Sequence, residues 1–129
     1  MLTIKTYIRE SKIPNAGLGL FSFEFIPKGN IVWKETEFSE IRYTQSEWDN
    51  LPQQMRDNIA IYAYKSNGKY HLNIDNSRHM NHSDKPSLVV DDNGNNIAAT
   101  DIHPGDELTC NYKDFYDNDY LESILNIGI

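Results

Sequence analysis

Short runs of branched and aromatic residues, each closed by a glycine- or proline-containing turn, constrain the fold of this chain more than any other feature. Runs of this kind are typical of β-strands, and they predict strands over residues 3–9, 18–23, 30–35, 59–65, 69–74, 88–90, 96–100 and 107–110. Because regular helices do not alternate with these runs, we expect small sheets in a folded or barrel-like arrangement and no βαβ units.

Two segments favour helix, and one dipeptide favours a tight hairpin. Thr44 and Glu47 have the spacing of a capping box, which predicts a short helix from about residue 44, interrupted near Pro52 and followed by a second helical turn. Apolar residues at helical spacing predict a closing helix over residues 114–126. Asn67-Gly68 is the strongest hairpin signal in the chain. The sequence therefore predicts one mainly β domain with short helices.

The charge and the cysteine count exclude several classes of protein. The 129 residues carry 12 Lys and Arg against 19 Asp and Glu, a net charge of −7. An acidic surface argues against nucleic acid as a partner and favours a basic one. The lone Cys110 excludes a disulfide framework, and His79 and His82 lack a third neighbour for a metal site, so no metal is predicted. Since no apolar run suggests a signal peptide or a membrane span, we expect no membrane association and a cytoplasmic location.

Three segments are unusual for a plain β domain, although each is a weak signal alone. Gly17-Leu18-Gly19 allows close approach of a ligand to the backbone, but a strand follows it where the dinucleotide fingerprint needs a helix. Residues 78–83 place polar side chains between strands, and residues 107–112 end a strand with a tyrosine. Cys110 lies in an apolar run, which favours core packing over a nucleophilic role.

In this order along the chain, the segments resemble the SET domain, the fold of protein-lysine methyltransferases. Four blocks carry the resemblance, which extends over about residues 2–116: Ser11 to Phe21 with its Gly-x-Gly, Ile26 to Ile31 with Glu35, Asp75 to Ser83 with Asn-His-Ser and Pro86, and Ala99 to Tyr112 with Glu-Leu-Thr-x-x-Tyr.

The resemblance implies a single SET domain over residues 1–129, with its core in 2–116 and a helical tail in 117–129. It implies a β-clip-like fold of small sheets with a knot-like C-terminal crossing, and S-adenosylmethionine as the cofactor. By motif matching, Tyr112 is the expected catalytic residue. The expected cofactor contacts are the backbone of Leu18, Gly19 and Leu20, Asn81 and His82 largely through backbone groups, and Tyr112. The expected walls of the substrate channel are Tyr62, Tyr64, Phe115 and Tyr116.

The activity implied by the resemblance is methyl transfer to the ε-amine of a lysine in a basic protein substrate. Small SET proteins of viral or bacterial type often pair, so a homodimer is expected by analogy, and a viral source would place the protein in host cytoplasm or nucleus. His79, Asp84 and Ser87 depart from the family's usual Phe, Cys and Asn. These departures keep two alternatives open, a SET-like module that binds cofactor or a basic peptide without turnover, and methylation of a small amine.

Overall fold

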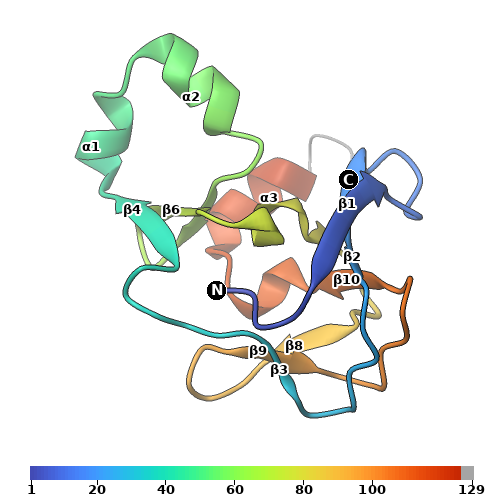
Figure 1. The fold of residues 1–129 in the computed structure, drawn as a ribbon. Coiled ribbons are helices and arrows are strands. Elements are labelled where there is room, and N and C mark those ends of the chain that lie inside the picture. Colours follow the sequence, from blue (N-terminus) through green and yellow to red (C-terminus); the bar gives the residue numbers. More distant parts are fainter. Residues whose placement is uncertain (126–129) are drawn as a thin grey trace.

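Three small sheets organise the protein, and the computed structural model describes them within residues 1–125 (Figure 1). The four-stranded sheet has the order β1 (Thr6–Glu10), β2 (Leu18–Ser22), β10 (Glu107–Cys110), β7 (Asn81–His82). One three-stranded sheet has the order β3 (Ile31–Trp33), β9 (Asn96–Ala98), β8 (Leu88–Val90). The other has the order β4 (Glu40–Tyr43), β6 (Lys69–Asn73), β5 (Tyr64–Ser66). The prediction of a mainly β fold of small sheets is confirmed.

The helices are short and lie in the middle and at the end of the described chain. They are α1 (Gln45–Asp49), α2 (Gln53–Ile59), η1 (Asn76–His79), η2 (Tyr112–Asp114) and α3 (Asn118–Leu125). The capping box starts α1, since the Thr44 hydroxyl accepts from the Glu47 amide at 3.1 Å and the Glu47 carboxylate accepts from the Thr44 amide at 2.9 Å. Within residues 1–125, no helix is long and apolar enough to cross a bilayer.

The structure differs from the predicted elements in several places, and the turn η1 and the strand β7 were not predicted. The strand expected over 59–65 is confined to β5, because α2 runs to Ile59 and its last turn continues in local hydrogen bonds up to Ala63. The strand β4 was missed, since its four residues show no clear apolar alternation. The closing helix begins only at Asn118, after the separate turn η2, and residue 126 of its expected range lies outside the described residues.

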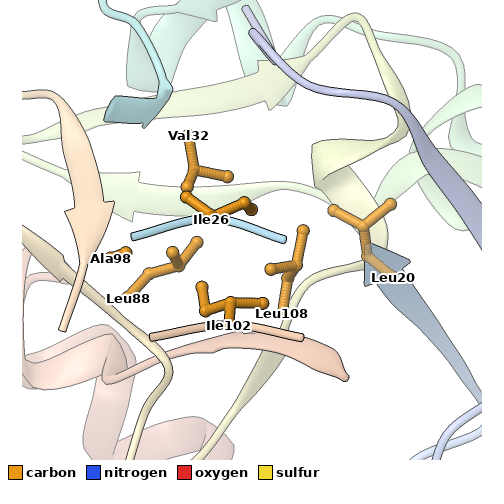
Figure 2. Close-up of a cluster of buried hydrophobic side chains, with 7 residues drawn as sticks. All are labelled: Leu20, Ile26, Val32, Leu88, Ala98, Ile102 and Leu108. Atoms are coloured by element: carbon orange, nitrogen blue, oxygen red, sulfur yellow. The ribbon is translucent and has the colours of Figure 1, made fainter. Parts of the chain in front are cut away.

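A compact apolar core joins the four-stranded sheet to the β3–β9–β8 sheet. Figure 2 shows its seven buried side chains, which converge from strands and loops far apart in the sequence: Leu20, Ile26, Val32, Leu88, Ala98, Ile102 and Leu108. The third sheet lies beyond this core, and α1 and α2 project from it at the upper left of Figure 1. Burial of this cluster fixes the two core sheets, whereas the third sheet is held mostly by its own pairing and by aromatic contacts.

The two motif segments of the C-terminal half meet in a parallel strand pair. Asn81 of β7 aligns with Thr109 of β10, and His82 aligns with Cys110, whereas the other strand pairs described here are antiparallel. Just beyond β7, the Ser83 amide donates to the Cys110 carbonyl at 2.9 Å. The expected meeting of the Asn-His-Ser segment with the final block is therefore built into the fold.

Candidate active site

A cavity of about 390 Å³ opens beside the end of β10, between the two three-stranded sheets. All five aromatic residues predicted for the channel and the catalytic position line it: Tyr62, Tyr64, Tyr112, Phe115 and Tyr116. They come from the segment around β5 and from the segment that begins at η2, so the third sheet and the C-terminal segment build the cavity together.

Four nearly parallel rings form a column along the cavity wall. The Tyr112 and Tyr116 rings lie 4.3 Å apart at 10°, Tyr116 and Tyr64 lie 5.0 Å apart at 2°, and Tyr64 and His71 lie 5.1 Å apart at 11°. Phe115 meets the Tyr64 ring edge-on at 5.2 Å. We call the rings of Tyr112, Tyr116, Tyr64 and His71 the ring column. Its aromatic surfaces suit a cationic or apolar guest.

Tyr112 stands at the inner end of the ring column and ties it to the strand crossing. Its backbone amide donates to Nδ1 of His82 at 3.1 Å, and its hydroxyl donates to the Met80 carbonyl at 3.3 Å. Burial raises the pKa of the Tyr112 hydroxyl to about 12. The phenol is therefore neutral near pH 7, so Tyr112 can orient a bound group but does not serve as a base.

His82 and Asn81 link this tyrosine to the glycine-rich strand. Because His82 Nδ1 accepts from an amide, its Nε2 carries the proton and donates to the Asp84 carboxylate at 3.0 Å. The Asn81 side-chain amide donates to the Leu18 carbonyl at 2.9 Å and to the Glu107 carboxylate at 3.3 Å. The predicted cofactor residues Leu18, Asn81 and His82 are thus brought together next to Tyr112.

Each of the two glycines of the Gly-x-Gly motif is needed for a different structural reason. Gly17 has a φ of +76°, a conformation that side-chain-bearing residues rarely adopt. A Cβ on Gly19 would lie 2.7 Å from a carboxylate oxygen of Glu107 and 3.2 Å from the Ser11 Cβ. That carboxylate is held by three donors, the Ser11 hydroxyl at 2.7 Å, the Lys12 amide at 2.8 Å and the Asn81 side chain. Gly19 is therefore required by packing.

The surface beside Asn81 is an open sheet edge, and a strand at such an edge offers backbone groups to a ligand. β7 is an edge strand of its sheet, so the outer side of Asn81 and His82 has no strand partner within the described residues. Leu18 is 52% exposed nearby, whereas the Leu20 side chain is fully buried in the core and reaches no ligand. The exposed backbone edge and the apolar Leu18 surface fit an adenosine-bearing cofactor, to which Leu20 could contribute only backbone atoms.

A polar wall adjoins the ring column, and the sequence did not predict it. Glu40 and Arg42 of β4 and His71 of β6 line the cavity together with Glu35. The Glu40 carboxylate accepts from the Tyr64 hydroxyl at 2.8 Å and from Arg42 at 3.0 Å, and Arg42 also reaches Glu35 at 2.9 Å. The available signal was the spacing of polar residues two apart in each strand, which puts them on one face.

The pKa values of this wall reflect its ion pairing. Burial opposes the negative charge of Glu40, but hydrogen bonds with His71 and Tyr64 outweigh burial and lower the pKa of Glu40. Burial likewise opposes the positive charge of His71, but the contact with Glu40 outweighs it and raises the pKa of His71. Burial and the neighbouring Glu40 raise the pKa of Tyr64 far above the ordinary value for tyrosine.

The positions that depart from the family pattern have defined structural contacts. His79 packs edge-on against Tyr62 at 5.2 Å, Asp84 binds His82, and the Ser87 hydroxyl donates to the Glu107 carbonyl at 3.1 Å. Cys110 is buried in the strand crossing, and burial raises the pKa of its thiol to about 12. This environment fits the predicted packing role of Cys110.

Comparisons with known proteins agree with this geometry. The family model described as SET domain matches residues 17–113. A ctPRC2 structure in an autoinhibited conformation bound to S-adenosylmethionine matches with a TM-score of 0.65 and 19% identity. The match covers 96% of the present chain and 17% of the ctPRC2 chain. The Polycomb Repressive Complex 2 of Chaetomium thermophilum bound to GSK126 gives a TM-score of 0.61 and 20% identity, covering 95% of this chain and 17% of that chain.

A small relative matches over nearly its whole length. This candidate histone methyltransferase of Plasmodium falciparum has a TM-score of 0.56 and 25% identity, and it covers 86% of this chain and 95% of that chain. The present chain therefore spans less than a fifth of the Polycomb chains but a length similar to the Plasmodium protein. A search of curated proteins found no match. The SET-domain family uses S-adenosylmethionine as its cofactor. Because the family model matches well over half of the residues of this chain, the chain belongs to the SET-domain family.

Proposed function

We propose that this chain is an S-adenosylmethionine-dependent protein-lysine N-methyltransferase whose active site is the cavity beside Tyr112. The observation that carries the proposal is the ring column, which leads from the cavity directly to the tyrosine at the strand crossing. Family membership supports methyl transfer as the chemistry. The preference for a lysine in a protein is our own inference from the shape and charge of this cavity.

The cavity supplies what a lysine needs in order to become a nucleophile. A free lysine has a pKa of about 10.4, so placing it in the neutral form at pH 7 costs about 4.6 kcal/mol. A partly desolvated channel lowers that pKa, and the aromatic side chains that line the cavity offer an apolar surface to the methylene groups of the lysine. Bound S-adenosylmethionine supplies the methyl group from a sulfonium centre, whose positive charge lowers the pKa of the amine further.

Each part of the site has a defined task in this proposal. Leu18, Gly19, Asn81 and His82 hold the cofactor at the exposed edge of β7, with Leu20 contributing backbone atoms only. Tyr112, which bonds to Met80 and His82, fixes the boundary between the cofactor side and the cavity. The outer aromatic walls are Tyr62, Tyr64, Phe115 and Tyr116.

A basic protein segment is the substrate class that the charges favour. The net charge of −7 dominates the long-range field of the chain, although Arg42 and Arg78 offset the carboxylates of Glu35 and Glu40 in the cavity wall itself. Such a field attracts a lysine-bearing cationic segment over a long range. The Plasmodium relative, described as a candidate histone methyltransferase, supports a protein substrate of this kind.

Labelled-methyl transfer tests the proposal. The purified chain is incubated with tritiated S-adenosylmethionine and a cell lysate, and the product is separated into proteins and metabolites. We expect label on protein lysines, and we expect Tyr112→Phe to reduce the rate about 100-fold because the reacting groups lose their alignment. Tyr43→Phe is the matched control, since the Tyr43 ring packs against Trp48 outside the cavity.

The two alternatives give different outcomes in the same assay. Label on a metabolite and on no protein would replace the proposal with methylation of a small amine. Cofactor binding in a calorimeter without label on any product would indicate a binding module. Equal rates for the wild type and Tyr112→Phe would contradict the role given to Tyr112.

A further inference from the structure

The protonation state of His71 is fixed at one ring nitrogen by its neighbours. Nε2 of His71 lies 3.0 Å from the backbone carbonyl oxygen of Ser66. A carbonyl oxygen only accepts hydrogen bonds, so Nε2 must carry a proton. In the neutral imidazole, Nδ1 is then a bare lone pair.

The Nδ1 lone pair of neutral His71 faces the carboxylate of Glu40, and no proton lies between the two groups. Nδ1 of His71 lies 3.4 Å from Oε2 of Glu40, and Nδ1 is buried without any other hydrogen-bond partner. With neutral His71, two acceptors face each other, an arrangement that is costly at a buried position. One added proton on Nδ1 turns the contact into a charged hydrogen bond. The pair therefore forms a site for a single exchangeable proton.

The same carboxylate oxygen connects this proton site to the cavity. The Tyr64 hydroxyl donates to Oε2 of Glu40 at 2.8 Å, while the Tyr64 ring lies in the ring column between His71 and Tyr116. The phenolic oxygen of Tyr64 keeps lone pairs that can accept a proton from a guest in the cavity. Hydroxyl, carboxylate and imidazole thus follow one another in a row, with a hydrogen bond from Tyr64 to Glu40 and a 3.4 Å contact from Glu40 to His71 that one added proton completes.

We propose that His71 is the acceptor of the proton that the substrate lysine must lose, and that Tyr64 and Glu40 carry the proton to it. The inference rests on the proposed methyltransferase function and names the group that prepares its substrate. One N–H bond of the ammonium breaks and its proton passes to the Tyr64 oxygen, directly or through a water in the cavity. The original Tyr64 proton moves to Glu40, and the proton ends on Nδ1 of His71. The products are a neutral amine and an imidazolium, with Tyr64 and Glu40 unchanged.

The charged and titratable groups around His71 suit a proton acceptor. Glu40 faces it from β4 and the Ser66 carbonyl from β5, and both favour its charged form, whereas its cross-strand neighbour Arg42 opposes that form. From β5, Tyr64 stacks on the ring and stays neutral, and Tyr116 stacks beyond it. The contact with Glu40 outweighs burial and raises the pKa of His71, which narrows the gap to the pKa of lysine. Because only neutral His71 accepts, activity should rise with pH through this pKa.

Nitrogen-15 NMR of the imidazole is the direct test. The protein is titrated alone, and then with a lysine peptide and sinefungin, an analogue that cannot donate a methyl group. We expect Nδ1 of His71 to gain a proton when the peptide binds, at a pH where the free protein holds His71 neutral. A His71 ring that stays neutral in the complex would overturn the proposal. Binding of the peptide is followed in the same spectra, so a failure of the proposed function, with no peptide bound, is recognised separately.

Variants provide a second readout that a purely structural role would not change. Tyr64→Phe keeps the stacked ring and removes the hydroxyl, and Glu40→Gln keeps an acceptor for Tyr64 but cannot carry a proton. Loss of a proton-transfer group should lower kcat about 100-fold for each variant and abolish the rise of kcat through the pKa of His71. Tyr43→Phe should retain both the rate and the profile, because Tyr43 lies outside the cavity. Wild-type pH dependence preserved in Tyr64→Phe would contradict the path.

Discussion

Replacing Gly19 by alanine should destabilise the protein through a clash with Glu107. The new Cβ would lie 2.7 Å from a Glu107 carboxylate oxygen and 3.1 Å from its Cδ, closer than carbon and oxygen atoms pack. The carboxylate cannot move away cheaply, because Ser11, Lys12 and Asn81 all donate to it. Overpacking costs about 1–3 kcal/mol, and each hydrogen bond to a charged group is worth about 1.5–3 kcal/mol. We therefore expect Gly19→Ala to lower the free energy of unfolding by about 2–4 kcal/mol.

A double-mutant cycle in urea isolates this cause. Glu107→Ala removes the two nearest atoms and frees the Ser11 side chain to give way, so adding Gly19→Ala in that background should cost less than about 1 kcal/mol. The two changes should be coupled by at least about 1.5 kcal/mol. A single Gly19→Ala variant as stable as the wild type would refute the packing argument. Strict additivity in the cycle would do the same, and would point to the contact with the Ser11 Cβ instead.

Three further predictions concern the core, the thiol and the polar wall. Leu88→Ala removes a fully buried side chain from the core and should lower the free energy of unfolding, measured by urea titration, by about 3 kcal/mol. A loss of less than about 1 kcal/mol, the size of a surface change, would contradict the assigned core. Cys110 should react with an aromatic disulfide reagent only after unfolding, since burial raises its pKa to about 12, and rapid reaction of the native protein would show that the strand crossing is open. The pKa of Glu40 is lowered in the folded protein. The ionised Glu40 therefore stabilises the fold above pH 4.5, the ordinary pKa of the group, and this stabilisation is lost as pH falls through the lowered pKa. The pKa of His71 is raised in the folded protein. The protonated His71 therefore stabilises the fold below pH 6.5, the ordinary pKa of histidine, and this stabilisation is lost as pH rises through the raised pKa. The urea midpoint of the wild type should therefore fall as pH rises above 6.5. In Glu40→Gln the midpoint should depend less on pH. Parallel plots of midpoint against pH for the two proteins would contradict the coupling between Glu40 and His71.

Local signals predicted those parts of the fold that local physics determines. Asn67 and Gly68 both have positive φ, 53° and 76°, as the hairpin signal required, and the Thr44 capping box starts α1. The two-residue strand β7 has no local pattern, because it exists only through its pairing with β10. Long-range pairing of this kind leaves no periodicity in the sequence.

The site was predictable to the extent that its residues lie in motifs. The aromatic residues expected for the channel all line one cavity, although their individual roles stay predictions. Glu40 and His71 were not found, because their contact depends on the register between β4 and β6, where Arg42 aligns with His71. In the sequence, His71 is an isolated histidine. The Leu20 side chain points into the core, which leaves its predicted backbone contact with the cofactor as a prediction.

The most direct test of the central claim is the position of the transferred methyl group. A lysine-containing protein labelled by this chain in the presence of S-adenosylmethionine is digested and sequenced by tandem mass spectrometry, beside a reaction with Tyr112→Phe. We predict a methyl group on the ε-amine of lysine in the wild-type reaction and about 100-fold less of it with the variant. A methyl group found on another residue type, or equal lysine methylation by both proteins, would contradict the account of the cavity and of Tyr112.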